Sequence, residues 1–477
     1  MKKNREFKNK KITIMGLGLH GGGVGSAKFF AEEGAKVTVT DIKSEDRLLL
    51  SIKLLKKYKN ISFVVGQHRT EDFASADLII KNPAVNPSSK YLEIARQNKV
   101  PIKTDIEVFL ESCPCEVIGV TGTKGKSTTV ALIKKILAKE FDRVILAGNV
   151  RVSALEQLKK ITKKSICILE LSSAQLEDLA LFKKSPHVSV VLNILPDHLN
   201  RHKNFQAYIE AKKIIFAHQK RKDFLILNQD DQILKSFSER ARAKVLFFGT
   251  EKTLFFGTGK SSGAYRKKGG AIYFSNEKQV VLKKSDYSEN LGGHNVSNLL
   301  AAVTVAKLYK IDNSTIRSVV GAFKKPEGRI ELIKTKKGVK YYNDTTATMP
   351  DAAICGIKSF KGKNITLIAG GEDKGLDYAL MADEIILNVK RLILFDGTAS
   401  EKLIKELIIR AKTKKKSLKK LLIGKSVGTV TDAVKIATEH LEAKDNIVLL
   451  SPGAASFNMF ENEFDRGNQF NKAVLGL

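Results

Sequence analysis

The chain has 477 residues, enough for two or three domains that each bury a core. Its composition is that of a globular protein, and no apolar run reaches the ~20 residues that cross a bilayer, so we expect no membrane insertion. Lys and Arg outnumber Asp and Glu by 82 to 50, but the densest basic cluster, residues 412–420, has no aromatic residue for base stacking. We therefore expect a solvated basic surface and no specific nucleic-acid partner.

The N-terminal segment is basic but runs directly into the apolar stretch ITIMGLG, without the cleavage site of a signal peptide. The four cysteines (Cys113, Cys115, Cys167 and Cys355) are too few and too scattered for a disulfide framework. The Cys113-Pro114-Cys115 pair also lacks the spacing of a zinc site. These features predict a reduced, cytoplasmic protein.

Short β-branched runs alternate with helical patterns in the first block of the chain, which predicts a parallel sheet with helices on both faces. The expected strands are ITIMGLG, KVTVTD, ISFVVG and DLIIKNP, with a helix from about Val24 to Glu33. Gly16, Gly18 and Gly21 form G-x-G-x-x-G after the first strand, and Asp41 ends the second. The pattern predicts a helix N-terminus that binds a diphosphate, with a carboxylate for a sugar or base. NAD and a nucleotide-linked substrate fit it equally well.

A second glycine-rich loop lies in GVTGTKGKSTT, residues 119–129, after another apolar strand. It follows the phosphate-loop pattern that ends in Gly-Lys-[Ser/Thr], with Lys126 and Ser127 at its end. Such a loop directs backbone N–H groups at an anion, the lysine adds a positive charge, and the serine hydroxyl can reach Mg²⁺. This loop predicts binding of a nucleoside triphosphate.

Polar residues follow two further expected strands of this second block. Glu170 lies in SICILELSSAQLE, and Asp197 and His198 follow VSVVLNIL. A glutamate and a histidine from neighbouring strand ends can both reach Mg²⁺ beside a triphosphate. His198 and His202 have the spacing of a zinc pair, but no glutamate of the H-E-x-x-H type lies between them.

The remainder of the chain continues the α/β pattern. Residues 244–290 contain short alternating strands that predict an antiparallel edge, and the Pro- and Gly-containing segment 324–331 is expected to be a linker. Four strands follow it, in VKYYND, NITLIAGG, RLILFDG and NIVLLSPG. The predicted fold class is α/β with three domains: a Rossmann-like first domain, a central phosphate-loop domain with a mostly parallel sheet, and a Rossmann-like last domain.

Seven segments in order resemble motifs of the Mur ligase family over essentially the whole chain: TGTKGKSTT, ELSSAQLE, LNILPDHLNRH, GGHNVSN, NDTTATMPDA, GGEDKG and LSPGAASFNMFENEFDRG. The fifth and seventh are similar to those of the glutamate-adding members, and the D-N-P-R motif of the diaminopimelate- or lysine-adding members is absent. The resemblance implies a UDP-sugar domain over 1–112, an ATP domain over 113–325 and a glutamate domain over 326–477.

The implied activity is ATP-dependent amide ligation in peptidoglycan precursor synthesis, by a cytoplasmic monomer. ATP would phosphorylate the carboxylate of UDP-N-acetylmuramoyl-L-alanine, and the amine of D-glutamate would then attack the acyl phosphate. The cofactors would be two Mg²⁺ ions, and Lys212 matches a lysine that is carbamylated in this family.

The resemblance also implies a role for individual residues. The catalytic residues would be Lys126, Glu170, His198 and Lys212, and the metal ligands Ser127, Glu170, His198 and carbamylated Lys212. ATP would contact Gly122, Thr123, Lys124, Gly125, Lys126, Ser127, Thr128, Asn295, Asn298, Arg329 and Asp344. The UDP-sugar would contact Gly18, Leu19, His20, Asp41, Asn149, Ser172 and Gln175. Glutamate would contact Thr348, Lys374, Ser456 and Phe457.

Three positions depart from the family pattern. Many members have Lys where Thr346 stands and His where Gly328 stands, and Ala84 replaces a glycine that often contacts the uridine part. These departures concern contacts with ATP and uracil rather than the reaction. The alternatives are a Mur-type ligase for another amino acid, including L-glutamate, a folate polyglutamate ligase, and a basic phosphate-loop ATPase that binds nucleic acid. The glycine-rich first domain argues against the folate enzyme.

Overall fold

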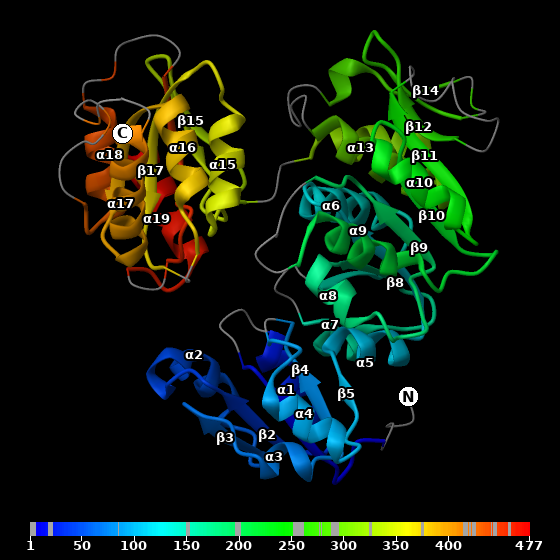
Figure 1. Cartoon of the computed structure of the whole chain (residues 1–477). Coiled ribbons are helices and arrows are strands. Elements are labelled where there is room, and N and C mark those ends of the chain that lie inside the picture. The colour runs from blue at the N-terminus through cyan, green and yellow to red at the C-terminus, as the bar shows by residue number, and fades with distance from the viewer. Residues whose placement is uncertain are drawn as a thin grey trace. The chain divides into compact units, whose positions relative to one another are not determined.

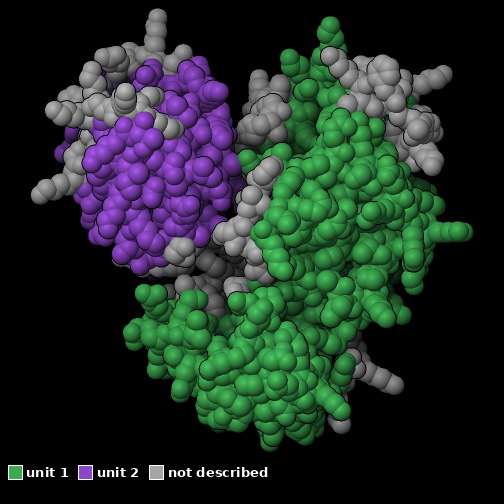
Figure 2. Space-filling model, in the orientation of Figure 1, with its two compact units in different colours: residues 1–324 green, residues 325–477 purple. Residues whose placement is uncertain are grey.

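The computed structural model describes residues 6–17, 22–83, 85–148, 153–195, 202–250, 262–275, 277, 279–287, 295–323, 327–373, 376–413, 418, 421, 426–439, 441, 446–456 and 459–477. The chain divides into two compact units, residues 1–324 and 325–477 (Figure 2). Two sheets belong to the first unit and one to the second (Figure 1). The predicted α/β class with mostly parallel sheets is confirmed. None of the helices described has the length and apolarity needed to span a bilayer.

The first sheet and its helices come from the N-terminal part of the first unit. They are, in chain order, β1 (Lys11–Met15), α1 (Gly22–Glu32), β2 (Lys36–Asp41), α2 (Glu45–Leu55), β3 (Ile61–Val65), α3 (Glu71–Ala74), β4 (Leu78–Lys81), α4 (Lys90–Gln97), β5 (Ile102–Lys103) and α5 (Asp105–Ser112). The strand order is β3-β2-β1-β4-β5, and all neighbours are parallel. The chain winds outward from β1 to β3 and then returns to β4. This reversal creates a crevice between β1 and β4, the usual ligand site of such sheets.

The second sheet comes from the rest of the first unit. Its elements are β6 (Glu116–Thr121), α6 (Lys126–Leu137), β7 (Val144–Gly148), α7 (Ala154–Gln157), β8 (Ile166–Glu170), α8 (Ser173–Asp178), β9 (Val188–Val191), α9 (Phe205–Lys213), β10 (Phe224–Asn228), α10 (Gln232–Arg240), β11 (Lys244–Thr250), β12 (Ser262–Arg266), β13 (Ile272–Phe274), β14 (Val280–Leu282), α13 (Val296–Leu308) and α14 (Asn313–Gly321). Short 3₁₀ turns occupy Leu158–Lys160, Ile214–Phe216 and Lys284–Asp286. The strand order is β14-β13-β12-β11-β10-β9-β6-β8-β7.

The antiparallel edge of this sheet is smaller than the sequence predicts. β11 and β12 pair in parallel, and the antiparallel pairs are β12–β13 and β13–β14. α13 is apolar on nearly all sides, and ten of its residues are buried. A helix of this kind must be covered by other elements, and α13 packs with α6 and the strands in one apolar core.

The second unit contains β15 (Glu331–Lys336), β16 (Val339–Asn343), α15 (Pro350–Lys358), β17 (Asn364–Gly370), α16 (Ala379–Asn388), β18 (Val389–Phe395), α17 (Thr398–Thr413), α18 (Val430–Thr438), β19 (Asn446–Leu450) and α19 (Glu463–Leu475). The strand order is β15-β16-β19-β17-β18, with β15 antiparallel and the rest parallel. β15 is absent from the sequence prediction. Lys337 and Gly338, with φ of +47° and +80°, form the tight turn of the β15–β16 hairpin, and this Lys-Gly pair was the signal available in the sequence.

Candidate active site

The phosphate loop (residues 122–127) joins β6 to α6 at the switch point of the second sheet. β6 lies between β8 and β9, and the chain continues outward on both sides of it. Gly122 and Gly125 have φ of +153° and +87°, values that favour glycine. A Cβ atom on Gly125 would lie 2.0 Å from the side-chain oxygen of Asn298. The loop geometry therefore depends on glycine, and it places the N-terminus of α6 where such sheets bind anions.

Lys126 and Ser127, at the start of α6, contact groups of the loop and of β8. Nζ of Lys126 donates hydrogen bonds to the carbonyl oxygens of Gly122 and Thr123, at 2.8 and 3.0 Å. Oγ of Ser127 donates to Oε2 of Glu170 at 2.7 Å. Glu170 is the last residue of β8, and its side chain is buried. The structure thus brings together a cation, a hydroxyl and a carboxylate that lie apart in the sequence.

Lys212 approaches the same loop from α9. It is 1% exposed, and its Nζ donates to Oγ1 of Thr121 at 3.3 Å and to the carbonyl oxygen of Gly122 at 3.2 Å. Nζ also lies 4.8 Å from the centre of the Tyr208 ring. The Tyr208 hydroxyl is in turn 2.9 Å from Oγ1 of Thr123. Lys212 therefore lies against the loop, and its predicted role at the metal site stays a prediction. Tyr208 was missed because nothing local in the sequence marks it.

Asparagines hold the outer side of the loop. Asn193, two residues beyond β9, accepts a hydrogen bond from N–H of Lys124 at 2.9 Å and donates one to its carbonyl oxygen at 3.0 Å. This contact was also missed in the sequence. Asn298 donates to Oδ1 of Asn295 at 2.9 Å, and both side chains are buried. Asn298 and Gly125 are in direct proximity, so one predicted adenine contact lies at the phosphate loop.

The first glycine loop, whose described residues are Gly16, Leu17 and 22–25, is held by Asp41. The buried Asp41 carboxylate accepts hydrogen bonds from the backbone N–H groups of Leu17 and Lys43, both at 3.0 Å. A Cβ atom on Gly23 would lie 2.3 Å from the carbonyl oxygen of Leu17, so α1 starts against the end of β1. A small cavity lies at this point, lined by Ile14, Gly16, Gly22, Gly23, Ser26, Ile80, Lys81, Asn82, Pro83 and Asp105.

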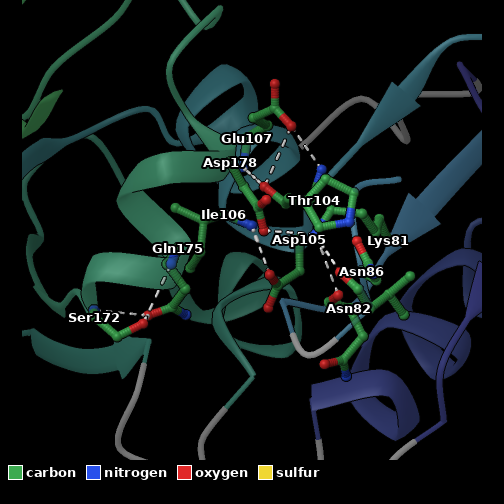
Figure 3. Close-up of polar contacts among 12 residues, drawn as sticks. Lys81, Asn82, Asn86, Thr104, Asp105, Ile106, Glu107, Ser172, Gln175 and Asp178 are labelled. Atoms are coloured by element: carbon green, nitrogen blue, oxygen red, sulfur yellow. Dashed lines mark hydrogen bonds and ion pairs between the residues drawn. The ribbon is translucent and has the colours of Figure 1, made fainter. Parts of the chain in front are cut away.

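A buried polar cluster next to this cavity links the two sheets of the first unit (Figure 3). Nζ of Lys81, at the end of β4, lies 2.8 Å from Oδ2 of Asp178 at the end of α8, and both side chains are at most 7% exposed. Burial raises the pKa of Asp105, at the start of α5, to about 6. Ser172 and Gln175 form the capping box of α8, in which each side chain bonds the backbone of the other. Their predicted contact with the UDP-sugar remains a prediction.

In the second unit, Asp344 follows β16 and lies beside Ser451, which follows β19. Oγ of Ser451 donates to Oδ2 of Asp344 at 2.7 Å, and N–H of Ile330 donates to Oδ1 at 3.2 Å. Burial raises the pKa of Asp344 to about 7, against the lowering influence of the Ser451 hydrogen bond and of the Arg329 charge. The Arg329 side chain is exposed. The two predicted ATP-binding residues of this unit are therefore electrostatic neighbours.

Two of the departures from the family pattern are hydrogen-bonded to each other. The backbone N–H and the hydroxyl of Thr346 both donate to the carbonyl oxygen of Gly328, at 3.1 and 2.8 Å. Gly328 has φ of +68°, and a Cβ atom there would lie 2.7 Å from the methyl group of Thr345. Glycine at 328 therefore follows from the backbone conformation of this chain.

Arg466 organises the loop after β16. It is fully buried, donates from Nε to Oγ1 of Thr345 at 3.1 Å, and donates from Nη2 to the Thr345 carbonyl oxygen at 2.9 Å. Burial lowers its pKa to about 9. Oγ of Ser456 is also buried and has no hydrogen-bond partner among the described residues, while Thr348 is half-buried. A buried hydroxyl of this kind is a candidate to bind a ligand.

Several predicted site residues lie outside the described part of the chain: Gly18, Leu19, His20, Ala84, Asn149, Asp197, His198, Lys374 and Phe457. Their predicted roles stay predictions. His202 is described, and its Nε2 lies 3.0 Å from Oγ of Ser173 in a buried position. Within the described ranges, Lys124 has an exposed side chain and Thr128 a half-buried one in the first turn of α6.

Comparison with known proteins places these features in a family. Three family models match consecutive parts of the chain: the Mur ligase MurD-like N-terminal domain over residues 10–104, the Mur ligase middle domain over 120–306, and the Mur ligase glutamate ligase domain over 328–453. Among solved structures, the MurF ligase from Thermotoga maritima in complex with ADP is similar in fold, with a TM-score of 0.55 and 16% identity over all of both chains.

Relatives are similar over nearly the full length. A protein of Roseiflexus sp. (strain RS-1) is 39% identical, and the alignment covers 98% of this chain and 99% of the relative. A protein of Borreliella afzelii (strain PKo) is 38% identical over 98% of each chain. Both are named UDP-N-acetylmuramoylalanine–D-glutamate ligase. With matching models over most of its length and relatives at this identity, the chain belongs to the Mur ligase family.

Proposed function

We propose that this chain is an ATP-dependent ligase that adds D-glutamate to UDP-N-acetylmuramoyl-L-alanine in peptidoglycan precursor synthesis. The observation that carries the proposal is the phosphate loop with Ser127 bonded to buried Glu170, in a chain similar over nearly its full length to ligases of that name. We assign residues 1–112, 113–325 and 326–477 to the UDP-sugar, ATP and glutamate domains. We also propose a cytoplasmic monomer.

The phosphate loop would hold the triphosphate. The amides at the start of α6 would bind phosphate oxygens, and Lys126, which here donates to the carbonyl oxygens of Gly122 and Thr123, would turn its ammonium group toward the transferring phosphoryl group. Asn295 and Asn298 are assigned to the adenine, and Arg329 and Asp344 to the phosphate and ribose of ATP. Positioning and charge neutralisation would then supply most of the rate enhancement, because phosphoryl transfer needs little covalent help from the protein.

The side chains at the loop fit Mg²⁺. Ser127 Oγ and Glu170 Oε2 are hard oxygen donors that lie 2.7 Å apart, and oxygen donors are the ligands that Mg²⁺ prefers. We assign Ser127, Glu170 and His198 as ligands. Bound Mg²⁺ would supply neutralisation of phosphate charge. Glu170 can serve as a metal ligand because burial at the end of β8 fixes the orientation of its carboxylate.

We further propose that Lys212 is carbamylated. The ammonium group would first lose a proton to solvent. The neutral Nζ would then attack the carbon of CO₂, forming an N–C bond as one C=O π pair moves to oxygen, and would lose a second proton to solvent, so that overall a cation becomes an anion. The reaction requires the neutral amine, and Lys212 is held away from solvent at 1% exposure. The carbamate would help to hold a second Mg²⁺. Lys213, half-buried and 2.7 Å from Oε1 of Glu210, offers a control on the same helix.

The UDP-sugar and glutamate would bind away from the phosphate loop. The first glycine loop with Asp41 would hold the UDP part, and Ser172 and Gln175 the sugar. In the second unit, the buried hydroxyl of Ser456 would join Thr348, Lys374 and Phe457 in binding glutamate. The alanine carboxylate would attack the γ-phosphorus of ATP as ADP leaves. The neutral glutamate amine would then attack the acyl carbon and lose a proton to solvent, and phosphate would leave as the amide forms.

The test is phosphate release by the full chain with ATP, UDP-N-acetylmuramoyl-L-alanine and a panel of amino acids, with the amide product identified by mass spectrometry. We expect phosphate release only when UDP-N-acetylmuramoyl-L-alanine and an amino acid are both present, with a preference for D-glutamate. Equal turnover with L-glutamate, meso-diaminopimelate or lysine would favour another Mur-type ligase. ATP hydrolysis that needs DNA but not the UDP-sugar would favour the nucleic-acid ATPase. For Lys212, ¹³C-labelled bicarbonate should give a carbamate NMR signal in the wild type and in Lys213→Ala, but not in Lys212→Ala.

A further inference from the structure

Three of the four cysteines meet near the amino-terminal ends of β6 and β8, two neighbouring strands inside the second sheet. Cys113 caps the end of α5, Cys115 directly precedes β6, and Cys167 lies on β8. In the sheet, Cys167 pairs with Val117. Because side chains two residues apart on an extended chain share a face, Cys115 falls on the same side as Cys167. The sequence shows only the Cys113-Pro114-Cys115 pair, and the pairing of β6 with β8 supplies the third thiol.

The sulfur atoms form a small triangle. Sγ of Cys115 lies 3.6 Å from Sγ of Cys113 and 3.5 Å from Sγ of Cys167, and all three lie within 4.8 Å of one another. Zinc binds thiolate sulfur at about 2.3 Å, which separates two sulfurs of a tetrahedral site by about 3.8 Å. A single ion can therefore reach all three sulfurs if they shift by no more than about 1 Å.

The chemistry of the triangle selects the class of ligand. All three donors are sulfur, and within the described residues this is the only group of three or more His, Cys, Asp or Glu side chains close enough to hold one ion. Sulfur-only sets favour thiophilic ions such as Zn²⁺ and Cu⁺ over Mg²⁺.

The site is also accessible. Cys167 is buried, but Cys113 and Cys115 are half-buried, and all three belong to or pack against the same apolar core. Solvent can therefore reach the two outer sulfurs and can provide a fourth ligand. A single disulfide would leave one of the three thiols unused, whereas one metal ion engages all of them.

We propose that Cys113, Cys115 and Cys167 form a three-thiolate site for one thiophilic metal ion. Binding replaces the S–H bonds of the cysteines by metal–sulfur bonds and releases the thiol protons to solvent. The ion ties the end of α5 to β6 and β8, and so stabilises the first unit. Cys167 precedes Glu170 by three residues, about 10 Å along β8, so the site is separate from the phosphate loop.

The test is equilibrium dialysis of the reduced full chain against Zn²⁺ and, in a separate anaerobic arm, Cu⁺, both with excess Mg²⁺ to occupy oxygen sites. We expect about one equivalent of Zn²⁺ or Cu⁺ in the wild type and in Cys355→Ala, and less than about a tenth in the Cys113→Ser/Cys115→Ser double variant. Co²⁺ should give thiolate-to-metal charge-transfer absorption that the double variant lacks. Bound Zn²⁺ should slow the reaction of three thiols, but not of Cys355, with a thiol reagent.

Cys355 is the matched control because it is half-buried, lies in the second unit and is not part of the triangle. The half-buried pair is substituted first because replacing buried Cys167 disturbs the core. Equal metal binding by the wild type and the double variant would overturn the proposal, as would binding of neither ion. These readouts do not depend on ligase activity, so they remain informative if the proposed function fails.

Discussion

The two glycine-rich loops of the first unit share one backbone arrangement but differ in the side chains around them. Each follows a strand at the switch point of a parallel sheet and leads into a helix, α1 or α6. At the first loop, the carboxylate of Asp41 accepts from two backbone amides. At the phosphate loop, Lys126 and Lys212 both donate to the carbonyl oxygen of Gly122.

This difference shows that a helix N-terminus predicts an anion without specifying it. The lysines and the Ser127–Glu170 pair suit a triphosphate with its metal, because they supply positive charge and oxygen ligands. Asp41 suits a ligand whose other groups donate hydrogen bonds, such as a sugar. Substitutions at the phosphate loop should therefore affect the binding of ATP, and substitutions at the first glycine loop should affect the binding of the UDP-sugar. The predictions below test that separation.

Lys126→Ala should have the largest effect. Removing a charge that neutralises the transferring phosphoryl group is expected to lower turnover on the order of 10²–10³-fold. Affinity for the UDP-sugar, measured by calorimetry, should stay unchanged. Lys134→Ala, which removes an exposed lysine of the same helix, is the control and should behave as the wild type. A Lys126→Ala enzyme with half the normal turnover would show that this loop does not hold ATP.

Alanine at one glycine of each loop should separate the two ligands. In Gly125→Ala the new Cβ meets Asn298 at 2.0 Å with φ of +87°, and in Gly23→Ala it meets the Leu17 carbonyl oxygen at 2.3 Å. Overpacking of this kind costs about 1–3 kcal/mol, or roughly 5- to 150-fold in affinity if the strain falls on the bound loop. Gly125→Ala should weaken the binding of ATP, and Gly23→Ala should weaken the binding of the UDP-sugar. Gly321→Ala, with nothing within 4 Å of its Cβ, is the control.

Isothermal titration of both ligands against the three variants gives the comparison. The assignment of one ligand to each loop would be contradicted if Gly125→Ala and Gly23→Ala each weakened the binding of both ligands to the same extent. Circular dichroism of each variant would show whether such a common loss comes from unfolding.

Asp41→Asn should weaken ligand binding at the first loop only, by about 1–3 kcal/mol. The amide has one oxygen where the carboxylate has two, so one of the N–H groups of Leu17 and Lys43 loses its partner. We expect KM for the UDP-sugar to rise roughly tenfold while KM for ATP is unchanged. Asp46→Asn, at an exposed carboxylate in the first turn of α2, is the control. A rise in KM for ATP would contradict the assignment.

Asp105, which lines the cavity of the first loop, should give the smallest effect, a pH dependence of stability. Its folded-state pKa of about 6 lies above the ordinary value of 3.8, so the folded chain binds the proton more tightly than the unfolded chain. The protonated carboxyl therefore stabilises the fold at low pH, and this contribution is lost as the pH rises from about 4 to about 6. A shift of this size corresponds to at most about 3 kcal/mol, and the partial exposure of Asp105 to solvent reduces it.

Urea unfolding of the wild type and Asp105→Asn between pH 4 and 8 measures this effect. The difference in unfolding free energy between the two proteins should change across that window and be constant above it. A constant difference at every pH would show that Asp105 titrates normally. Asp77→Asn, whose carboxylate accepts from the exposed N–H of Lys11, is the control.

The sequence alone predicted the features that depend on local pattern. Most strands of the three sheets were found because β-branched runs alternate with helices, although the two-residue strand β5 was not. The phosphate loop was found because its glycines and Lys126-Ser127 lie side by side in the chain. The family followed from motifs spread over the whole length. β15 was missed because Glu331 lies in a segment whose Pro and Gly predict a linker, although the Lys337–Gly338 turn marks a hairpin.

Only the tertiary structure decided which distant side chains meet. Ser127 contacts Glu170, Lys81 pairs with Asp178, and Cys115 joins Cys167, in each case through elements that are far apart in sequence. No local pattern specifies these contacts, because strand order and register bring the residues together. Burial then sets their chemistry: the pKa of Asp105 and Asp344 rises because water is excluded, and that exclusion is a property of the packed fold rather than of the residue type.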